Sequence, residues 1–226
     1  MTLSLSIEDL TVKSPRGRTL LACGRFAAGP GEAIGLRGPS GAGKSTFLYA
    51  LAGLQPAMTG QVSWQGTDLV RLGDSARARF RRENIGMIFQ DFLLFEELGA
   101  FGNATLATAF NGADKRRSIR QTAQRCLERL HVPKDRRTVD SFSGGERQRT
   151  AIARALAHDP AIILADEPTA SLDRTTADAL ICDLIDLART ERKTLIAVSH
   201  DAHLLEHMDR VVDIADGRLV GEATGA

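Results

Sequence analysis

A glycine-rich segment, residues 38–46, has the residue types and spacing of a phosphate-binding loop. It matches the pattern GxxxxGK[ST] and lies between an apolar run and a helical run. Glycines allow successive backbone N–H groups to face phosphate oxygens, and the following helix adds the positive end of its dipole. Lys44 can reach the β- and γ-phosphates, and the Ser45 hydroxyl can ligate Mg²⁺. The alternative is a plain glycine-rich turn, which this setting disfavours. The segment reads Gly38-Pro39-Ser40-Gly41-Ala42-Gly43-Lys44-Ser45-Thr46.

Two adjacent carboxylates, Asp166 and Glu167, follow a short apolar run at residues 161–165. Such a run is typical of a strand in the middle of a parallel sheet, and ligands bind at the carboxyl ends of these strands. We therefore expect Asp166 to help hold Mg²⁺ and Glu167 to orient or deprotonate an attacking water. A solvated loop start is the alternative, and the phosphate-loop pattern upstream disfavours it.

A second candidate anion site precedes the helical run at residues 146–157. Ser143 is expected to cap this helix, and Gly144 and Gly145 would expose backbone N–H groups at its start. An ordinary capped helix is one interpretation. The functional hypothesis is that this site meets the γ-phosphate of ATP bound to another copy of the chain.

Strand-like and helical runs alternate along most of the chain, which predicts a largely parallel sheet with helices on both faces. Strands are expected at residues 3–12, 19–28, 33–37, 61–64, 85–89, 161–165, 194–199 and 210–215. Helices are expected at residues 44–53, 75–82, 146–157, 175–190 and 202–207. Residues 91–140 have helical periodicity and many basic residues, so they are expected to form a helical insertion into this core.

Composition and charge disfavour several classes of protein. The chain has 226 residues, with Lys+Arg 29 against Asp+Glu 28 and a formal net charge of +1, so a nucleic-acid partner is not expected. No apolar run approaches the roughly 18 residues that span a bilayer. The N-terminus lacks the basic start of a signal peptide, which favours a cytoplasmic protein. Three scattered cysteines show neither metal-ligand spacing nor a disulfide framework.

These motifs, taken together, closely resemble those of the ATP-binding subunits of ABC transporters over essentially the whole chain. The stretch after Phe142 matches the signature motif LSGGQ, with Phe142 in place of Leu and Glu146 in place of Gln. Gln90 matches the Q-loop glutamine, Ser171-Leu172-Asp173 the D-loop, and His200 the switch histidine. Residues 72–79, 85–90, 143–149 and 164–168 make the chain most similar to the lipoprotein-release and macrolide-export group of this family.

The resemblance implies an α/β fold of the P-loop NTPase type. This fold has a mostly parallel central sheet, an N-terminal antiparallel β subdomain and a helical insertion. Residues 1–90 would hold the β subdomain and the phosphate-loop part of a RecA-like core. Residues 91–157 would form the helical subdomain with the signature motif, and residues 158–226 the remainder of the core.

The resemblance also implies ATP and Mg²⁺ as cofactors, with two copies clamping two ATP molecules head to tail. The phosphate loop of one copy would hold the triphosphate, and Ser143, Gly144 and Gly145 of the other would cover the γ-phosphate. Asp173 would bridge the dimer interface. The implied catalytic residues are Lys44, Gln90, Glu167 and His200. The implied metal ligands are Ser45, Gln90 and Asp166.

The implied partners are an integral membrane permease and a second ATPase copy, most simply in a homodimer, on the cytoplasmic face of the inner membrane. Phe92-Leu93-Leu94-Phe95 either packs within the helical insertion or borders the groove that receives a permease helix. The basic residues at 77–82 and 115–137 are expected to form solvated helical faces.

Two other functions are also compatible with these motifs. One is a soluble ABC ATPase in a non-transport assembly, such as a phosphonate-degradation complex, because its motifs would be identical. The other is a regulator that binds ATP without turnover, which the complete set of catalytic residues argues against.

One departure from the family concerns recognition of the adenine base. The first hairpin, residues 12–18, has no aromatic to stack on adenine, although Arg16 or Arg18 could stack instead. We therefore expect either weaker ATP binding or weaker selection against GTP than is usual in the family.

Overall fold

The computed structural model describes residues 3–134, 137–170 and 172–224. Its strands are β1 (Leu5–Lys13), β2 (Thr19–Ala28), β3 (Ala33–Arg37), β4 (Met58–Trp64), β5 (Thr67–Asp68), β6 (Ile85–Ile88), β7 (Ile162–Asp166), β8 (Thr194–Val198), β9 (Arg210–Ala215) and β10 (Arg218–Thr224). Its helices are α1 (Lys44–Leu51), α2 (Asp74–Asn84), α3 (Ala100–Ala104), α4 (Ala113–Arg129), α5 (Gly144–Leu156), α6 (Arg174–Thr190) and α7 (Ala202–Glu206), with 3-10 turns at Leu106–Phe110 and Val139–Ser141.

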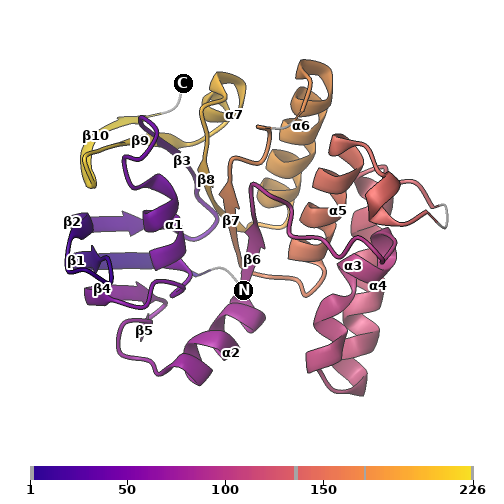
Figure 1. Cartoon of the computed structure of the whole chain (residues 1–226), viewed down its shortest axis with the longest axis horizontal. Coiled ribbons are helices and arrows are strands. Elements are labelled where there is room, and N and C mark those ends of the chain that lie inside the picture. Colours follow the sequence, from indigo (N-terminus) through magenta and orange to yellow (C-terminus); the bar gives the residue numbers. More distant parts are fainter. Residues whose placement is uncertain (1–2, 135–136, 171, 225–226) are drawn as a thin grey trace.

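The strands of the described part of the chain form one mixed sheet in the order β5-β4-β1-β2-β10-β9-β3-β8-β7-β6 (Figure 1). Strands β9, β3, β8, β7 and β6 pair in parallel. The N-terminal strands β2, β1, β4 and β5 pair antiparallel, as do β9 and β10. The α/β fold class predicted from the sequence is therefore confirmed.

Strand β7 separates two hydrophobic cores, because its side chains alternate between the two faces of the sheet. Ile162 and Leu164 belong to the core that contains Phe47 of α1 and the N-terminal strands. Ile163 belongs to the core that contains Leu184 of α6 and the apolar residues of α4 and α5. All five residues of β7 are buried, as is typical of a central parallel strand covered on both faces.

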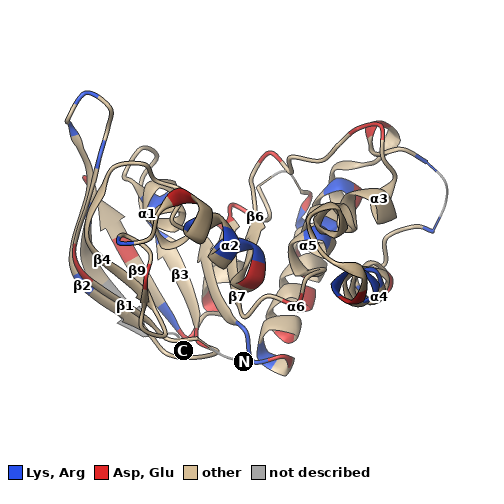
Figure 2. Ribbon diagram, turned by 90° about the horizontal axis from the view of Figure 1, so that it is seen from below, with Lys and Arg blue, Asp and Glu red and all other residues tan. Residues whose placement is uncertain are grey.

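The helices α3, α4 and α5 pack together beside the sheet and form the helical insertion (Figures 1 and 2). Asn103 of α3 is fully buried and fixes the segment before it, because its side-chain amide donates to three backbone carbonyls and accepts from the Phe95 N–H. The segment between β6 and α3 is therefore held in a defined shape, although it has no regular secondary structure.

Most expected elements are present, with boundaries that differ by a few residues. Strand β4 begins at Met58, three residues before its predicted start, and α1 ends at Leu51, before its predicted end. Strands β5 and β10 were not predicted. β10 is the return strand of a hairpin with β9, and its turn has positive φ at Asp216 and Gly217.

In the described part of the chain, no helix combines the length and the apolar composition that crossing a bilayer requires.

Packing of β6 against the end of α5 gives a test of the fold. A methyl group at Gly86 would lie 2.5 Å from the Ala155 carbonyl oxygen and 2.9 Å from Pro160. We expect Gly86→Ala to lower the free energy of unfolding by about 1–3 kcal/mol, because a backbone oxygen cannot yield easily. Gly24→Ala on β2 is the matched control, since nothing lies within 4 Å of that position. Urea denaturation measures both variants, and equal midpoints would contradict this packing.

Candidate functional site

The phosphate-loop segment connects β3 to α1, and its glycines are required by the backbone itself. Gly38 has φ 154°, and a Cβ there would lie 2.0 Å from the Ile214 carbonyl oxygen. Gly43 has φ 102° and immediately precedes α1. Side chains at these two positions would be strained or would clash with the backbone. The loop therefore curls so that the first turn of α1 faces the carboxyl ends of the central strands.

Lys44 is buried with its ammonium group folded back into this loop. Its Nζ donates to the carbonyl oxygens of Gly38 at 2.7 Å and Pro39 at 3.0 Å. The same Nζ lies 3.1 Å from Nε2 of His200, which follows β8. The loop thus surrounds a cation at the place where a phosphate chain would need one.

Asp166 ends β7 and faces the first two turns of α1. Its Oδ1 accepts a hydrogen bond from the Ser45 hydroxyl at 3.0 Å, and its Oδ2 accepts one from the Tyr49 hydroxyl at 2.9 Å. Burial, and then the hydrogen bond to Asp166, raise the pKa of Tyr49 to about 12, so this hydroxyl keeps its proton at neutral pH.

The chemistry of this donor set fits Mg²⁺. A hydroxyl and a carboxylate supply hard oxygen atoms, and a Mg²⁺ site of this kind takes its other ligands from phosphates and water. Ser45 and Asp166 are already within hydrogen-bond distance of each other. Within the described residues, no cluster of three or more His, Cys, Asp or Glu side chains could hold a metal ion by itself.

Glu167 stands in a strained and partly desolvated position. Its φ is +48°, in the left-handed region, and its N–H donates to the Val198 carbonyl at 3.0 Å. Burial raises the pKa of this carboxyl above its ordinary value, although the nearby His200 and Lys44 oppose the shift. Its Oε2 accepts from the His200 N–H at 3.3 Å, and its Oε1 lies 3.4 Å from His200 Nε2. A carboxylate of raised pKa is the more effective proton acceptor.

These groups surround one cavity of 550 Å³ at the carboxyl ends of the parallel strands. The cavity brings together the phosphate loop, Gln90, Glu167 and His200, which lie far apart in the sequence. Asp166 lies behind Ser45 and is only 3% exposed. The residues that line the cavity are Leu20, Ser40, Gly41, Gly43, Lys44, Ser45, Thr46, Gln90, Glu167, Ala170, Val198, His200 and Asp201.

The second candidate anion site does not line this cavity. Ser143 caps α5 as its sequence predicts, and it forms a capping box with Glu146. The Ser143 hydroxyl accepts from the Glu146 N–H at 3.3 Å, and the Glu146 carboxylate accepts from the Ser143 N–H at 2.7 Å. Gly144 and Gly145 form the first turn of the helix. The Ser143 segment is therefore a capped helix start that lies apart from the cavity.

Asp173 also lies outside the cavity, at the start of α6. Its carboxylate accepts from the Thr176 N–H at 3.0 Å and from the Thr176 hydroxyl at 2.7 Å, so it caps the helix. Ser171, the first residue of the predicted D-loop motif, lies outside the described residues.

One ionic contact that the sequence did not reveal joins the start of α6 to the segment after β8. The Arg174 guanidinium donates to both oxygens of Asp201, at 3.0 and 3.1 Å. Asp201 also accepts from the Thr169 hydroxyl at 3.1 Å. No local sequence pattern predicts this ion pair, because the two residues are 27 positions apart. The contact of Tyr49 with Asp166 could have been predicted, because Tyr49 follows Ser45 by one helical turn and so lies on the same face of the helix.

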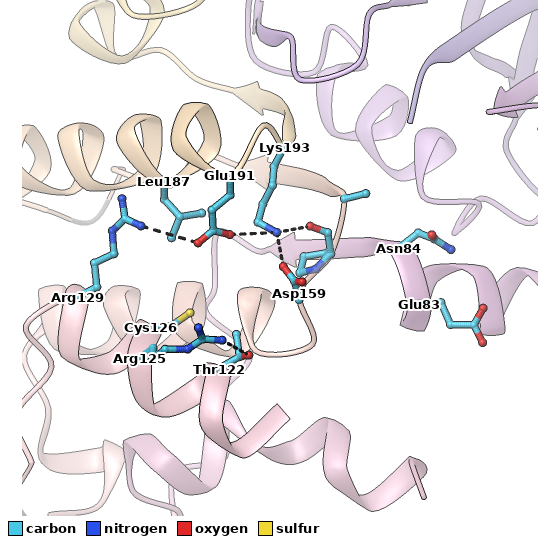
Figure 3. A pocket seen from close by; sticks show the side chains of 12 residues that line it. Glu83, Asn84, Thr122, Arg125, Cys126, Arg129, Asp159, Leu187, Glu191 and Lys193 are labelled. Atoms are coloured by element: carbon cyan, nitrogen blue, oxygen red, sulfur yellow. Dashed lines mark hydrogen bonds and ion pairs between the residues drawn. The ribbon is translucent and has the colours of Figure 1, made fainter. Parts of the chain in front are cut away.

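A larger cavity, of 720 Å³, lies at the opposite, amino ends of β7 and β8 (Figure 3). Lys193 is buried there, and its Nζ lies 2.6 Å from Asp159, 2.8 Å from the Pro160 carbonyl and 3.2 Å from Glu191. Glu191 lies 3.8 Å from Arg129 of α4. These charges compensate one another and join the helical insertion to the sheet.

Comparisons with known proteins give a consistent result. The family model described as ABC transporter matches residues 24–170. An uncharacterized ABC transporter ATP-binding protein of Mycobacterium tuberculosis is 42% identical over 192 residues, covering 84% of this chain and 77% of the relative. The lipoprotein-releasing system ATP-binding protein LolD of Cereibacter sphaeroides is 38% identical, covering 97% and 100%. The structure of the dimeric ATP-binding cassette MJ0796 bound to ADP and Pi superposes with a TM-score of 0.88 at 32% identity, covering 97% and 98%.

The raised pKa of Glu167 predicts how the stability of the free protein depends on pH. A group whose pKa is higher in the folded state lowers stability as the pH rises through that pKa. We therefore expect Glu167→Gln to unfold at a higher temperature than the native chain at neutral pH. The gain should shrink as the pH falls toward the ordinary Glu value of 4.5. Scanning calorimetry without nucleotide measures this, and a gain that grows on acidification would contradict the desolvation of Glu167.

Proposed function

This chain belongs to the ABC transporter family as an ATP-hydrolysing subunit of the LolD type, and from this premise we propose how its residues perform the reaction. The observation that carries the proposal is the gathering of Lys44, Ser45, Gln90, Glu167 and His200 around one cavity. We assign the β- and γ-phosphates of ATP to the phosphate loop, and Ser45 and Asp166 are the residues that would hold Mg²⁺.

Binding begins with the phosphate loop. Backbone N–H groups from Ser40 to Thr46 donate hydrogen bonds to the phosphate oxygens. The Lys44 ammonium leaves the two loop carbonyls that it contacts in the free chain and donates to the β- and γ-phosphates instead. The Ser45 hydroxyl and the Asp166 carboxylate would hold the metal ion, and the Gln90 side chain lines this end of the cavity. Bound Mg²⁺ neutralises charge on the phosphate oxygens.

Glu167 and His200 then act on the attacking water. The water oxygen bonds to the γ-phosphorus while Glu167 accepts a proton from that water. The bond between the γ-phosphorus and the bridging oxygen breaks, giving ADP and phosphate. His200 lies between Glu167 and Lys44, so it is placed to donate a hydrogen bond to the γ-phosphate. The left-handed backbone of Glu167 aims its side chain into the cavity.

A second copy of the chain completes the site. The Ser143-Gly144-Gly145 segment lies outside the cavity of its own chain and offers a capped helix N-terminus, which favours an anionic ligand. In a two-fold dimer, the signature segment of each copy covers the γ-phosphate held by the other. Asp173 would lie at this interface. We propose a homodimer, since one sequence carries both halves of the site.

The helical insertion presents an apolar surface suited to a membrane partner. Leu93 and Phe95 are 56% and 55% exposed, whereas Leu94 packs against the core. Arg154 holds this segment by donating to the carbonyls of Phe92 and Leu93. We propose that residues 91–157 dock on a cytoplasmic helix of a membrane permease, and that the protein works at the cytoplasmic face of the inner membrane. Exposed apolar side chains on a fixed segment are typical of such a surface.

The nucleotide cavity predicts weak selection between purine bases. Leu20 of β2 contributes an apolar side chain, and no Phe, Tyr or Trp is among the described residues that line the cavity. We expect the dissociation constants for ATP and GTP to agree within about tenfold, because apolar contact alone does not distinguish the two bases. Leu20→Ala should weaken both nucleotides equally, whereas Val220→Ala, an exposed apolar site on β10, should weaken neither. Fluorescence titration measures this, and strong rejection of GTP would contradict it.

Replacement of Glu167 tests the reaction itself. We expect Glu167→Gln to lower kcat for ATP by about 100-fold or more and to leave ATP binding intact, because the amide keeps the shape of the side chain but accepts no proton. Glu206→Gln on α7 is the matched control, since Glu206 is exposed and lies outside the cavity. Phosphate release measures turnover, and equal rates for all three proteins would refute the proposed reaction.

A further inference from the structure

The chain has a single tyrosine, Tyr49, and it lies against the carboxylate that the proposed metal site uses. Tyr49 is half-buried on α1, one helical turn after Ser45. Residues four apart lie on the same face of a helix, so both hydroxyls face the end of β7. The Tyr49 hydroxyl donates to Asp166 Oδ2 at 2.9 Å.

The two carboxylate oxygens of Asp166 accept hydrogen bonds from different donors. Oδ1 accepts from Ser45, a residue whose hydroxyl the proposed function assigns to the metal. When that hydroxyl turns its lone pair to a cation, Oδ1 loses its donor. Oδ2 keeps its donor, because Tyr49 approaches from the other side and has no phosphate or metal to bind. Asp166 is only 3% exposed, so little solvent is available to replace a missing hydrogen bond.

We propose that Tyr49 is a positioning residue for the metal site: its hydroxyl holds Asp166 by Oδ2 and thereby keeps Oδ1 directed at Mg²⁺. This inference rests on the proposed function, because it deepens the role of Asp166. A hydrogen bond to the second oxygen fixes the carboxylate plane, so less freedom is lost when the cation binds. The hydroxyl therefore sets the concentration of Mg²⁺ at which nucleotide binding tightens.

The contacts of the Tyr49 ring allow the role of its hydroxyl to be tested separately from the packing of the ring. The Tyr49 ring lies 6.3 Å from the Phe89 ring, at an interplanar angle of 51°. Phe89 immediately precedes Gln90, which lines the nucleotide cavity. A phenylalanine at position 49 would keep this ring contact and lose only the hydrogen bond to Asp166. The hydroxyl and the ring can therefore be tested independently.

The experiment measures binding of the fluorescent nucleotide mant-ATP to the full chain. It is run in EDTA and at increasing free Mg²⁺, for the native chain and for Tyr49→Phe. We expect the half-saturating Mg²⁺ concentration to rise about tenfold in Tyr49→Phe, the lower end of the effect of removing a group that orients a metal ligand. Binding in EDTA should change by less than about twofold, because the phosphate loop is untouched.

Phe89→Leu is the matched control, since it alters the ring contact and keeps the tyrosine hydroxyl. It should leave the Mg²⁺ dependence unchanged. Thermal unfolding without nucleotide checks that both variants are folded.

Three results would overturn the proposal. They are an unchanged Mg²⁺ dependence in Tyr49→Phe, an equal loss of affinity in EDTA, and the same shift in Phe89→Leu. A native chain that binds mant-ATP equally with and without Mg²⁺ would instead refute the proposed metal site itself.

Discussion

The contact between Asp166 at the end of β7 and the first turns of α1 is the interaction on which the site depends. Strand β7 is buried on both faces, so its carboxyl end is fixed by two hydrophobic cores. The hydroxyls of Ser45 and Tyr49 join that end to the helix after the phosphate loop. This contact therefore helps to fix the position of Lys44, on α1, relative to Glu167, which follows β7.

Electrostatic compensation explains why the residues around this contact can be so polar. Lys44 is buried, but two loop carbonyls and the His200 ring surround its ammonium group. Glu167 is partly desolvated, and the nearby positive charge limits the increase in its pKa. The charged groups of the site are therefore compensated by neighbouring protein groups in the free chain. A bound triphosphate and metal ion would take the place of these neighbours. Such preorganisation lets binding energy be used on the reaction rather than on rearrangement.

Local sequence patterns predicted the parts of the molecule that local physics determines. The phosphate loop, the Ser143 cap and the apolar strand before Asp166 each follow from neighbouring residues. β10 was missed, although the dipeptide Asp216-Gly217 is a strong hairpin signal. The pairing of Arg174 with Asp201 could not be predicted, because only the tertiary fold brings the two together. The same limit applies to which oxygen of Asp166 each hydroxyl contacts.

In the proposed dimer each ATP site is built from two copies of the chain, and a mixing experiment tests this arrangement. Lys44→Ala removes the phosphate-loop cation, Ser143→Arg blocks the signature segment, and each variant alone should hydrolyse no ATP. In a mixed two-fold dimer, one site combines both intact halves, so an equal mixture should recover up to about a quarter of the native ATPase activity. A mixture as inactive as its components, with mixed dimers demonstrated by cross-linking, would contradict a site shared between two copies.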